Sequence, residues 1–377
     1  MRQSIIAIIA ASGLLLAWIL FRLPGVLPAD PDLHMGRPEH VTGGTGPYLV
    51  GIQPWLEQAD YQSAGRLHDR LASYLDSIAP QLAEAPGSIV VLPEHAGTWL
   101  VAAGAPRATF TAGTTGTAMG WLILANPLAL ASAWLGSGEE DRLAAAIFRM
   151  RAERMARDYQ AVFSALASEY HVTLVAGSIV LPEPGVEAGQ LTVGDGPLYN
   201  TSAVFHPDGQ IDALLVRKSH PIPSEAGFTT PWPAERLPVF DTPSGRLAVM
   251  ICADSWHPNL YASARAGGAQ IIAVPAFLQP SNVWDEPWGG YTTGWPEDAD
   301  QADAGGLTEG EAWQRYALAG RLGSAGAGFG MTAYLRGNLW DLGSDGSNIA
   351  VTGSQIYPGS HDNAAAITLL PLAAATP

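Results

Sequence analysis

The stretch LAVMICADSW at residues 247–256 decides the fold. Its uninterrupted apolar run, bounded by Gly245 and Pro258, is typical of a buried strand, and the run ends at Cys252, the only cysteine of the chain. Reactive groups gather at the carboxyl ends of strands in α/β sheets, because the N-terminus of the following helix favours negative charge. Cys252 is therefore a candidate nucleophile, and the alternative reading is a small buried apolar residue.

The composition describes a folded, acidic chain. With 377 residues, of which 47% are hydrophobic, it has ample material for one large domain or two smaller ones. The formal charge of −16 argues against nucleic acid and against an anionic membrane surface as the main electrostatic partner. A single cysteine excludes an intrachain disulfide and leaves the redox compartment open.

The N-terminal sequence predicts a membrane segment. Residues 5–21 carry no charge and lie between Arg2 and Arg22, and a helix of this length reaches about 25 Å. We expect residues 1–22 to be an uncleaved single-pass anchor, with a cleaved signal peptide as the alternative and with the domain on the extracytoplasmic side. Residues 23–46, rich in proline and glycine, are interpreted as a linker.

Hydrophobic patterning after the linker predicts alternating strands and helices. A strand at 48–53, a helix at 67–79 and a strand at 88–94 form a βαβ unit. Two further helices are expected, a long one from the capping sequence at Ser137 to near His171 and a shorter one from Thr308 to Arg321. Further strands are expected at 172–181, 198–206, 211–217, 270–275, 328–335 and 347–353. The folded domain is thus placed at residues 47–360, and residues 361–377 are interpreted as a C-terminal tail.

An insertion at residues 108–137 contains no charged residue. It is apolar enough to suggest a membrane span, but Asn126-Pro127 interrupts it, and a span would place Glu94 and the later strands on opposite sides of the membrane. We expect a lid or a membrane-dipping hairpin beside the active site, with a buried helical hairpin as the alternative.

Three polar residues follow predicted buried strands, namely Glu94, Lys218 and Cys252. A carboxylate, an ammonium group and a thiol at one rim of a sheet can divide the work of acyl transfer between them. Each residue also has a structural interpretation, Glu94 as a helix cap and Lys218 as a solvated strand end. The three together favour a catalytic site.

Two other kinds of site are less well supported. A Cys–His hydrolase is a rival mechanism, because histidines lie close after the three polar residues, at His95, His220 and His257. A later loop is rich in carboxylates, but Ala302 stands where a calcium loop needs a ligand; the carboxylates are Asp298, Asp300 and Asp303. We therefore expect neither a metal nor another cofactor.

The sequence resembles the carbon–nitrogen hydrolase family, the nitrilase superfamily, at three motifs in matching order and approximate spacing. The motifs are VVLPE at 90–94, RKSHPIPSE at 217–225 and MICAD at 250–254, and the resemblance covers roughly residues 47–355. It implies a four-layer α-β-β-α sandwich, often doubled by pairing of two subunits into a homodimer. It also implies Glu94 as general base, Lys218 as stabiliser of the tetrahedral intermediate, Cys252 as nucleophile and Glu225 as a second acidic residue that positions the others.

The chemistry of these residues agrees with the implied roles. A thiol with an ordinary pKa near 8.5 is mostly protonated at neutral pH, so the nucleophile needs a neighbouring base or cation. Attack on an amide or nitrile carbon creates negative charge, for which Lys218 and the backbone N–H of Ala253 are the expected donors, and one such donor contributes about 3 kcal/mol. Ala253 stands where the family often has an aromatic residue, and Pro221 where leucine is common. These departures concern the pocket and therefore the substrate.

We therefore expect a membrane-anchored hydrolase that cleaves a non-peptide carbon–nitrogen bond through a cysteine thioester. The bond is an amide rather than a nitrile, in a small or lipid-linked substrate. An N-acyltransferase with the same three residues is the alternative, since apolipoprotein N-acyltransferase carries a similar domain on a base of several spans, whereas this chain has one clear predicted span. A catalytically silent binding module is a third reading.

Overall fold

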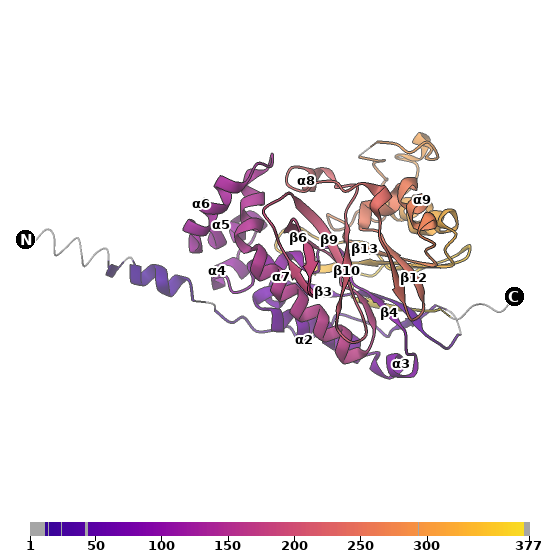
Figure 1. Cartoon of the computed structure of the whole chain (residues 1–377), viewed down its shortest axis with the longest axis horizontal. Helices are drawn as coiled ribbons and strands as arrows, with labels where there is room; N and C mark the ends of the chain where they lie inside the picture. Colours follow the sequence, from indigo (N-terminus) through magenta and orange to yellow (C-terminus); the bar gives the residue numbers. More distant parts are fainter. Residues whose placement is uncertain (1–11, 14, 24, 42–43, 293, 373–377) are drawn as a thin grey trace, which may run out of the picture.

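The computed structural model describes residues 12–13, 15–23, 25–41, 44–292 and 294–372. Two sheets pack face to face, and helices cover the outer face of each sheet (Figure 1). This arrangement is the four-layer α-β-β-α sandwich that the sequence predicts.

The first sheet has the strand order β1-β18-β2-β4-β5-β9-β10, with β6 paired to β9. Strands β2 (Tyr48–Gln53), β4 (Ile89–Val91) and β5 (Thr173–Val175) are parallel, as the predicted βαβ unit requires. The sheet is completed by β1 (Glu39–His40), β6 (Ile179–Pro182), β9 (Leu198–Phe205), β10 (Ile211–Arg217) and β18 (Ala366–Pro371).

The second sheet has the order β11-β12-β13-β14-β16-β17. Strands β12 (Gly245–Val249), β13 (Ile271–Ala276) and β14 (Phe329–Tyr334) are parallel, so Cys252 lies just beyond the carboxyl end of β12. The others are β11 (Val239–Thr242), β16 (Ile349–Thr352) and β17 (Gln355–Pro358), and two-stranded pairs join β3 (Trp55–Glu57) to β15 (Arg336–Asn338) and β7 (Gly185–Glu187) to β8 (Gln190–Thr192).

Alternation along β12 explains why the second sheet is apolar on both faces. Leu247 and Val249 point toward the first sheet and pack in the core between the sheets. Ala248 and Met250 point the other way and pack against the outer helices. Because successive strand residues face opposite sides, a strand buried on both faces reads as a continuous apolar run, which is the pattern seen at residues 247–251.

Two helical layers enclose the sheets. Helices α2 (Ala64–Asp76) and α7 (Arg142–Tyr170) cover the first sheet, whereas α9 (Pro258–Ala266) and α11 (Leu318–Arg321) cover the second. Shorter helices in the connections are α3 (Ala79–Glu84), α8 (Pro223–Ala226), α10 (Glu309–Tyr316), η1 (Gln58–Gln62), η2 (Thr98–Ala102), η3 (Ala234–Arg236), η4 (Cys252–Trp256), η5 (Gln301–Asp303) and η6 (Leu322–Ala325).

The charge-free insertion forms α4 (Arg107–Phe110), α5 (Thr115–Ala125) and α6 (Pro127–Gly136). The break predicted at Asn126-Pro127 is present, and α5 and α6 meet at a bend of 104°. The alternative of a buried hairpin is wrong, since α6 has no buried residue and Leu128 and Leu135 are 86% and 81% exposed.

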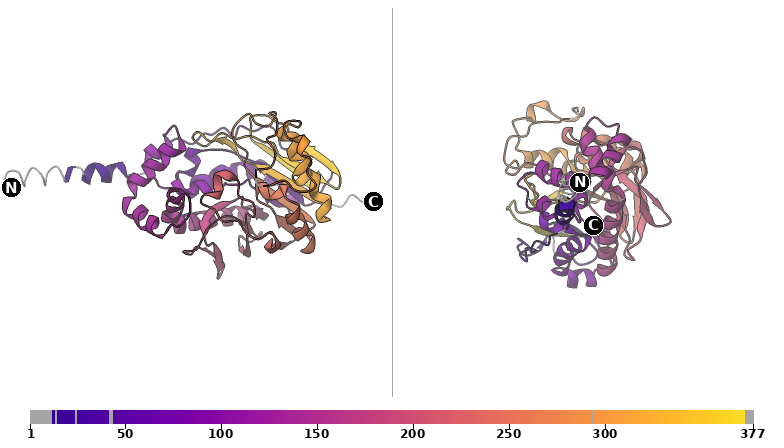
Figure 2. Two further views of the ribbon diagram at one scale, coloured as in Figure 1. Left: turned by 90° about the horizontal axis from the view of Figure 1, so that it is seen from above. Right: turned by 90° about the vertical axis from the view of Figure 1, so that its left-hand side faces the viewer.

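The N-terminal segment reaches this same end of the molecule. Residues 12, 13 and 15–21 are helical, and this helix projects outward from the end of the molecule that α5 and α6 form (Figure 2). The indole N–H of Trp18 donates to the backbone oxygen of Leu124 at 3.1 Å, and the rings of Phe21 and Trp121 lie 5.7 Å apart. The expected anchor at residues 5–21 falls partly outside the described residues. Within the described part of the chain, no single helix is long and apolar enough to cross a bilayer. The bent pair of α5 and α6 has the required length and hydropathy only when the two helices are taken together.

Several boundaries differ from those predicted. Helix α7 is capped by Asp141, which accepts from the N–H of Ala144, because the Ser137 hydroxyl instead bonds to Ala133 at the end of α6. The strand expected at 172–181 is two strands, β5 and β6, broken around Gly177, whose φ is +66°.

Both ends of the predicted domain also extend further than expected. Residues 366–371 of the expected tail form β18, which lies between β1 and β2 inside the first sheet. In the expected linker, residues 39–40 form β1, and Leu27 and Leu33 pack against the core of the first sheet.

Candidate active site

The four predicted site residues come from three loops at the carboxyl edge of the sandwich. Glu94 follows β4, Lys218 follows β10, Glu225 lies in α8, and Cys252 begins η4 directly after β12. All four are buried, with exposed fractions of 2%, 1%, 4% and 6% respectively. The fold therefore brings together the four residues that the sequence singled out.

The Lys218 ammonium group lies between two carboxylates. Its Nζ donates to Oε1 of Glu94 at 2.7 Å and to Oε2 of Glu225 at 2.5 Å. The side-chain amide of Asn200, on β9, donates to both carboxylates, at 2.9 Å to Glu94 and 2.8 Å to Glu225. The amide and the ammonium group together fix the two carboxylates relative to each other.

This arrangement sets the charges of the cluster. Burial would lower the pKa of Lys218, but the carboxylates of Glu225 and Glu94 outweigh burial and hold this pKa well above its usual range. Burial likewise opposes ionisation of Glu225, whereas Lys218 and His95 hold its pKa below the ordinary value. Lys218 is therefore an ammonium ion and Glu225 a carboxylate at neutral pH.

Cys252 adopts a left-handed backbone conformation, with φ at +49°. A non-glycine residue is held in this region only where the surrounding structure imposes it, and such residues cluster at functional sites. Burial raises the pKa of the thiol, as does the neighbouring Glu94 carboxylate, while Lys218 opposes the rise; the net pKa lies well above the ordinary value. Cys252 therefore rests as a neutral thiol, with Sγ 3.9 Å from the backbone oxygen of Phe277.

Asp254 ties the loop of Cys252 to the loop of Lys218. Its buried carboxylate accepts the backbone N–H groups of Ser219 at 2.9 Å, His220 at 2.8 Å and Ile251 at 3.3 Å. Burial raises the pKa of Asp254 to about 7, against the opposing effect of Lys218 and of these three N–H groups. The sequence analysis did not single out Asp254 or Asn200, although a buried polar residue that interrupts an apolar strand, such as Asn200, is a recognisable signal.

The histidines of the rival mechanism serve other contacts. His95 places Nε2 at 3.4 Å from Oε1 of Glu225, and its Nδ1 pairs with the Thr98 hydroxyl at 2.9 Å. The rings of His220 and His257 stack at 3.7 Å, and burial lowers the pKa of His257 to about 3. The groups that act on the thiol are Glu94, Lys218 and the Phe277 carbonyl, which favours the carboxylate and ammonium over a histidine.

Cys252 opens into a cavity of about 580 Å³. Glu94, Glu225 and Ala253 line it beside the thiol, and the rest of its wall is largely aromatic, with Trp256, Phe277, Trp288, Tyr291 and Trp313. None of the residues 108–137 is among the residues that line the cavity. The wall comes instead from the loop after β13 and from α10, which the sequence analysis had not assigned to the site.

A buried carboxylate holds this wall in place. Asp345 accepts the backbone N–H groups of Val283 at 2.6 Å and Trp284 at 3.0 Å, and it pairs with Arg336 at 2.8 Å and His361 at 2.7 Å. Because Arg336 follows the second sheet, these bonds fasten the loop to the body of the protein.

The carboxylates considered for calcium are engaged by protein groups. Asp298 pairs with Arg321, Asp303 pairs with Arg315 at 3.2 Å, and Asp300 caps η5 through the N–H of Ala302 at 2.9 Å. These contacts account for the acidic loop without an ion.

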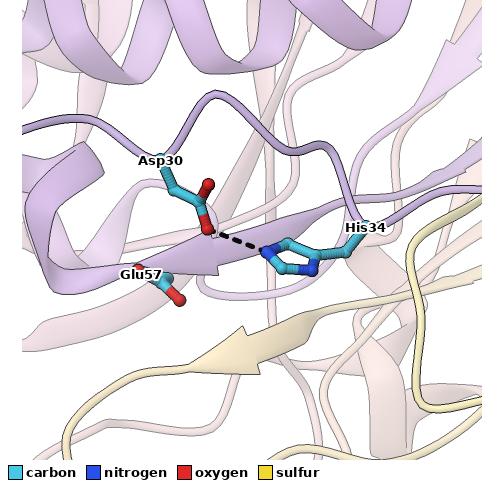
Figure 3. A group of neighbouring side chains, drawn as sticks. All are labelled: Asp30, His34 and Glu57. Carbon is cyan, nitrogen blue, oxygen red and sulfur yellow. Dashed lines mark hydrogen bonds and ion pairs between the residues drawn. The ribbon is translucent and has the colours of Figure 1, made fainter.

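Two other groups of side chains have a spacing that could hold a metal. Asp30, His34 and Glu57 bring one ligand atom each within 4.8 Å of one another, and His34 bonds to Asp30 at 2.9 Å (Figure 3). Glu94, His95 and Glu225 have the same spacing, but both of these carboxylates already bind the Lys218 ammonium group.

The site combines a layered α/β fold with a thiol and a carboxylate that line one cavity and an ammonium group bonded to that carboxylate, which defines a hydrolytic type of enzyme. The chain belongs to the carbon–nitrogen hydrolase family, because the family model described as carbon-nitrogen hydrolase matches residues 59–291, more than half of the chain. The resemblance stated from the three motifs is thereby confirmed.

Relatives and solved structures agree with this assignment. The chain is 32% identical over 118 residues to a probable hydrolase of Bacillus subtilis, covering 31% of this chain and 20% of that protein. It is 32% identical over 131 residues to an omega-amidase of Homo sapiens, covering 33% and 43% respectively. The matched stretches thus span less than half of these curated relatives.

Among solved structures, an amidase from Nesterenkonia sp. aligns with a TM-score of 0.51 at 16% identity, covering 88% of this chain and 92% of that one. A carbon–nitrogen hydrolase from Helicobacter pylori aligns with a TM-score of 0.52 at 19% identity, covering 85% and 88%. At such identities the structures support the fold. The name of the human relative, an omega-amidase, does not favour the N-acyltransferase alternative.

Proposed function

We propose that this hydrolase is an amidase that cleaves a non-peptide carbon–nitrogen bond through a thioester on Cys252. The observation that carries the proposal is the position of Lys218, whose ammonium group lies 2.7 Å from Glu94 and 2.5 Å from Glu225, two carboxylates that line the same cavity as the thiol. Amidase names among the relatives support the same reaction class.

In the first step Glu94 acts as general base. Since the thiol rests protonated, its proton passes to the Glu94 carboxylate as sulfur bonds to the amide carbon. The carbonyl electron pair moves onto oxygen, and this negative charge is stabilised by Lys218 and by the N–H of Ala253 in the first turn of η4. One such donor contributes about 3 kcal/mol to the stability of the transition state.

The second step releases the amine and then the acid. Protonated Glu94 returns its proton to the leaving nitrogen as the carbon–nitrogen bond breaks, which leaves a thioester on Cys252. Water then attacks the thioester carbon and gives a proton to Glu94, which passes it to the departing sulfur, so that the carboxylic acid leaves and the thiol is restored. Glu225 and Asn200 keep Lys218 and Glu94 in place through both steps.

The test uses the full chain in detergent with a panel of simple amides, nitriles and N-acyl amines, and measures released ammonia or amine. Cys252→Ala should lose activity by at least about 1,000-fold while its melting temperature stays close to that of the wild type. Asp241→Asn, which changes an exposed carboxylate on β11, is the control and should leave the rate unchanged. Activity retained in Cys252→Ala would contradict the proposal.

We also propose that the protein associates with a lipid bilayer through its N-terminal helix together with α5 and α6. Apolar side chains on these helices are left open to solvent: Leu15, Leu16, Ile19, Leu20, Leu124, Leu128 and Leu135 are each between 47% and 86% exposed. So large an apolar surface without a partner is unusual on a soluble protein and typical of a membrane contact.

Arginines flank this apolar surface in the way expected at a lipid headgroup. The guanidinium group of Arg22 lies 4.7 Å from the ring centre of Trp18, and that of Arg142 lies 4.9 Å from the ring centre of Trp134. Tryptophan and arginine are favoured at the interface between hydrocarbon and water. Because the chain as a whole carries a charge of −16, the attachment is apolar and does not require anionic lipid.

The single cysteine allows a direct test of the hairpin. In a Cys252→Ala background of the full chain, Leu128→Cys and, as a control, Asp241→Cys are labelled with an environment-sensitive dye and mixed with phosphatidylcholine vesicles. The fluorescence emission of the dye at position 128 should shift to shorter wavelength and should be quenched by brominated lipid. The emission of the dye at position 241 should not change. Equal behaviour of the two positions would contradict insertion of α6, and failure of the chain to float with the vesicles would contradict membrane association as a whole.

A further inference from the structure

The cavity beside Cys252 has an aromatic wall built from three separate segments. Trp256 ends η4, Trp288 and Tyr291 lie on the loop after β13, and Trp313 lies in α10. The ring centre of Trp256 lies 4.9 Å from that of Trp313, 5.7 Å from that of Trp288 and 5.8 Å from that of Tyr291. The four rings therefore form one continuous surface in the cavity.

The same wall contains a carboxylate. Glu309, the first residue of α10, lines the cavity and is half-buried. Glu94 and Glu225 share the single positive charge of Lys218, whereas Glu309 forms no ion pair within the described part of the chain. Burial raises the pKa of Glu309 to about 7, and the nearby indole of Trp313 opposes this rise.

Away from the Lys218 cluster, the cavity lining carries no permanently cationic side chain. Among the described residues that line the cavity there is neither an arginine nor a lysine, and its side-chain acids are Glu94, Glu225 and Glu309. Trp313 is 3% exposed, and its indole N–H faces Glu309 and favours the ionised carboxylate. Aromatic faces beside a desolvated carboxylate attract a cation through the negative potential of both, and they repel a second carboxylate.

We propose that Glu309 and the aromatic wall of Trp256, Trp288, Tyr291 and Trp313 form a subsite for an ammonium group, so that the substrate is an amide that carries a positive charge. The inference rests on the proposed amidase function, of which it names the substrate class. The competing explanation is an apolar wall for an uncharged acyl chain, with Glu309 serving only to complement the positive N-terminal end of α10.

Three amides of similar length and different charge separate these explanations. The full chain is supplied with 5-aminopentanamide, hexanamide and glutaramate, which end in an ammonium, a methyl and a carboxylate group, and released ammonia is measured. The subsite predicts that kcat/KM for the cationic amide exceeds that for the neutral amide by about tenfold or more, with the anionic amide below both.

Glu309→Gln should remove at least about fivefold of the preference for the cationic amide while leaving hexanamide within about twofold of the wild-type rate. Glu286→Gln is the matched control, because Glu286 is an exposed carboxylate whose backbone oxygen accepts the N–H of Glu309 but whose side chain lies outside the cavity lining. A preference for hexanamide, or an equal effect of Glu309→Gln on all three amides, would overturn the subsite.

A binding measurement tests the ammonium subsite independently of the proposed amidase function. If the wild type hydrolyses none of the amides, the proposed function fails, and calorimetry on Cys252→Ala decides about the subsite. Tighter binding of 5-aminopentanamide than of hexanamide, lost when Glu309→Gln is added, would support it. Equal binding of the two amides, or no measurable binding of either, would overturn it.

Discussion

The carboxylate of Asp254 accepts the backbone N–H of Ser219 at 2.9 Å, so the residue two positions after Cys252 is bonded to the residue that follows Lys218. The nucleophile and the ammonium group stand on different sheets, and this buried carboxylate is a direct connection between their loops. The relative position of Cys252 and Lys218 thus depends on a side chain that the proposed reaction does not itself use.

Replacement of Asp254 by asparagine should loosen this connection. In Asp254 the Oδ2 atom accepts the N–H of Ile251, whereas the asparagine amide places an N–H donor at this position. Two buried donors then face each other without an acceptor, which costs about 1–3 kcal/mol of stability. We expect kcat to fall by about 10- to 100-fold with KM little changed, because small displacements of reacting groups have large effects on rate. Asp241→Asn is the control, and an unchanged kcat in Asp254→Asn would show that the loops are positioned by other contacts.

The two effects of Glu94 on Cys252 can be separated by Glu94→Gln. The Glu94 carboxylate contributes to raising the pKa of the thiol, so its removal should lower the pH at which Cys252 becomes reactive toward iodoacetamide. Amide hydrolysis should nevertheless fall by at least about 100-fold, because the base that accepts and returns the proton is missing. A variant with faster alkylation and undiminished hydrolysis would exclude Glu94 as the base.

Asp345 should make the cavity wall sensitive to acid. Burial opposes its ionisation, but His361, the N–H of Trp284 and Arg336 hold the pKa of Asp345 below its ordinary value. A carboxylate with a lowered pKa in the folded state contributes stability that is fully present above about pH 4 and is lost as the pH falls below it. Asp345→Asn should lower the unfolding free energy by about 3 kcal/mol at pH 7, because it leaves Arg336 buried without its partner.

Melting temperatures between pH 3 and pH 7 test this. The difference between the wild type and Asp345→Asn in melting temperature should shrink as the pH falls below 4, because the unfolded wild-type chain then binds a proton that the folded carboxylate, with its lowered pKa, does not. A difference that stays constant with pH would show that Asp345 contributes through packing and not through its charge.

The sequence could predict that the site residues lie close together, because they are placed directly after strands. Glu94 and Cys252 each follow an apolar run that forms a strand in the parallel part of its own sheet, and the packing of the two sheets brings these two carboxyl ends together. Lys218 and Glu225 were placed by the motif that contains both. The strand that delivers Cys252 was predicted from its apolar run, whereas the four layers were implied by the resemblance to the family.

The remaining elements depend on contacts between residues distant in the sequence. Residues 366–371 are a short apolar run whose assignment as a strand depends on pairing with Tyr48–Gln53 near the other end of the domain. The cavity wall around Trp288 belongs to an irregular loop held by Asp345, and no periodicity reports on such a loop. The hydrophobic pattern of a short stretch of sequence does not report on contacts with residues that lie far away in the chain.

The preference for a cationic amide should itself depend on pH. Because the pKa of Glu309 is raised to about 7, its carboxylate is largely neutral at pH 6 and largely ionised at pH 8, whereas an alkyl ammonium group with a pKa near 10 stays charged throughout. The ratio of kcat/KM for 5-aminopentanamide to that for hexanamide should therefore rise between pH 6 and pH 8, with its midpoint near 7. Since kcat/KM reports on the free enzyme, the ratio follows the titration of the empty site.

Other titratable groups face the same cavity, namely Glu94, His95, Glu225, Cys252, His257 and Tyr291. Tyr334 is close enough to Glu309 for the two to interact. Groups that act on the reacting atoms affect both amides alike and cancel in the ratio, and His257, with its pKa lowered to about 3, stays neutral over this range. Glu309→Gln should make the ratio independent of pH. A rise that persists in this variant would assign the titration to another group in the cavity, and a flat wild-type ratio would show that Glu309 does not interact with the charge of the substrate.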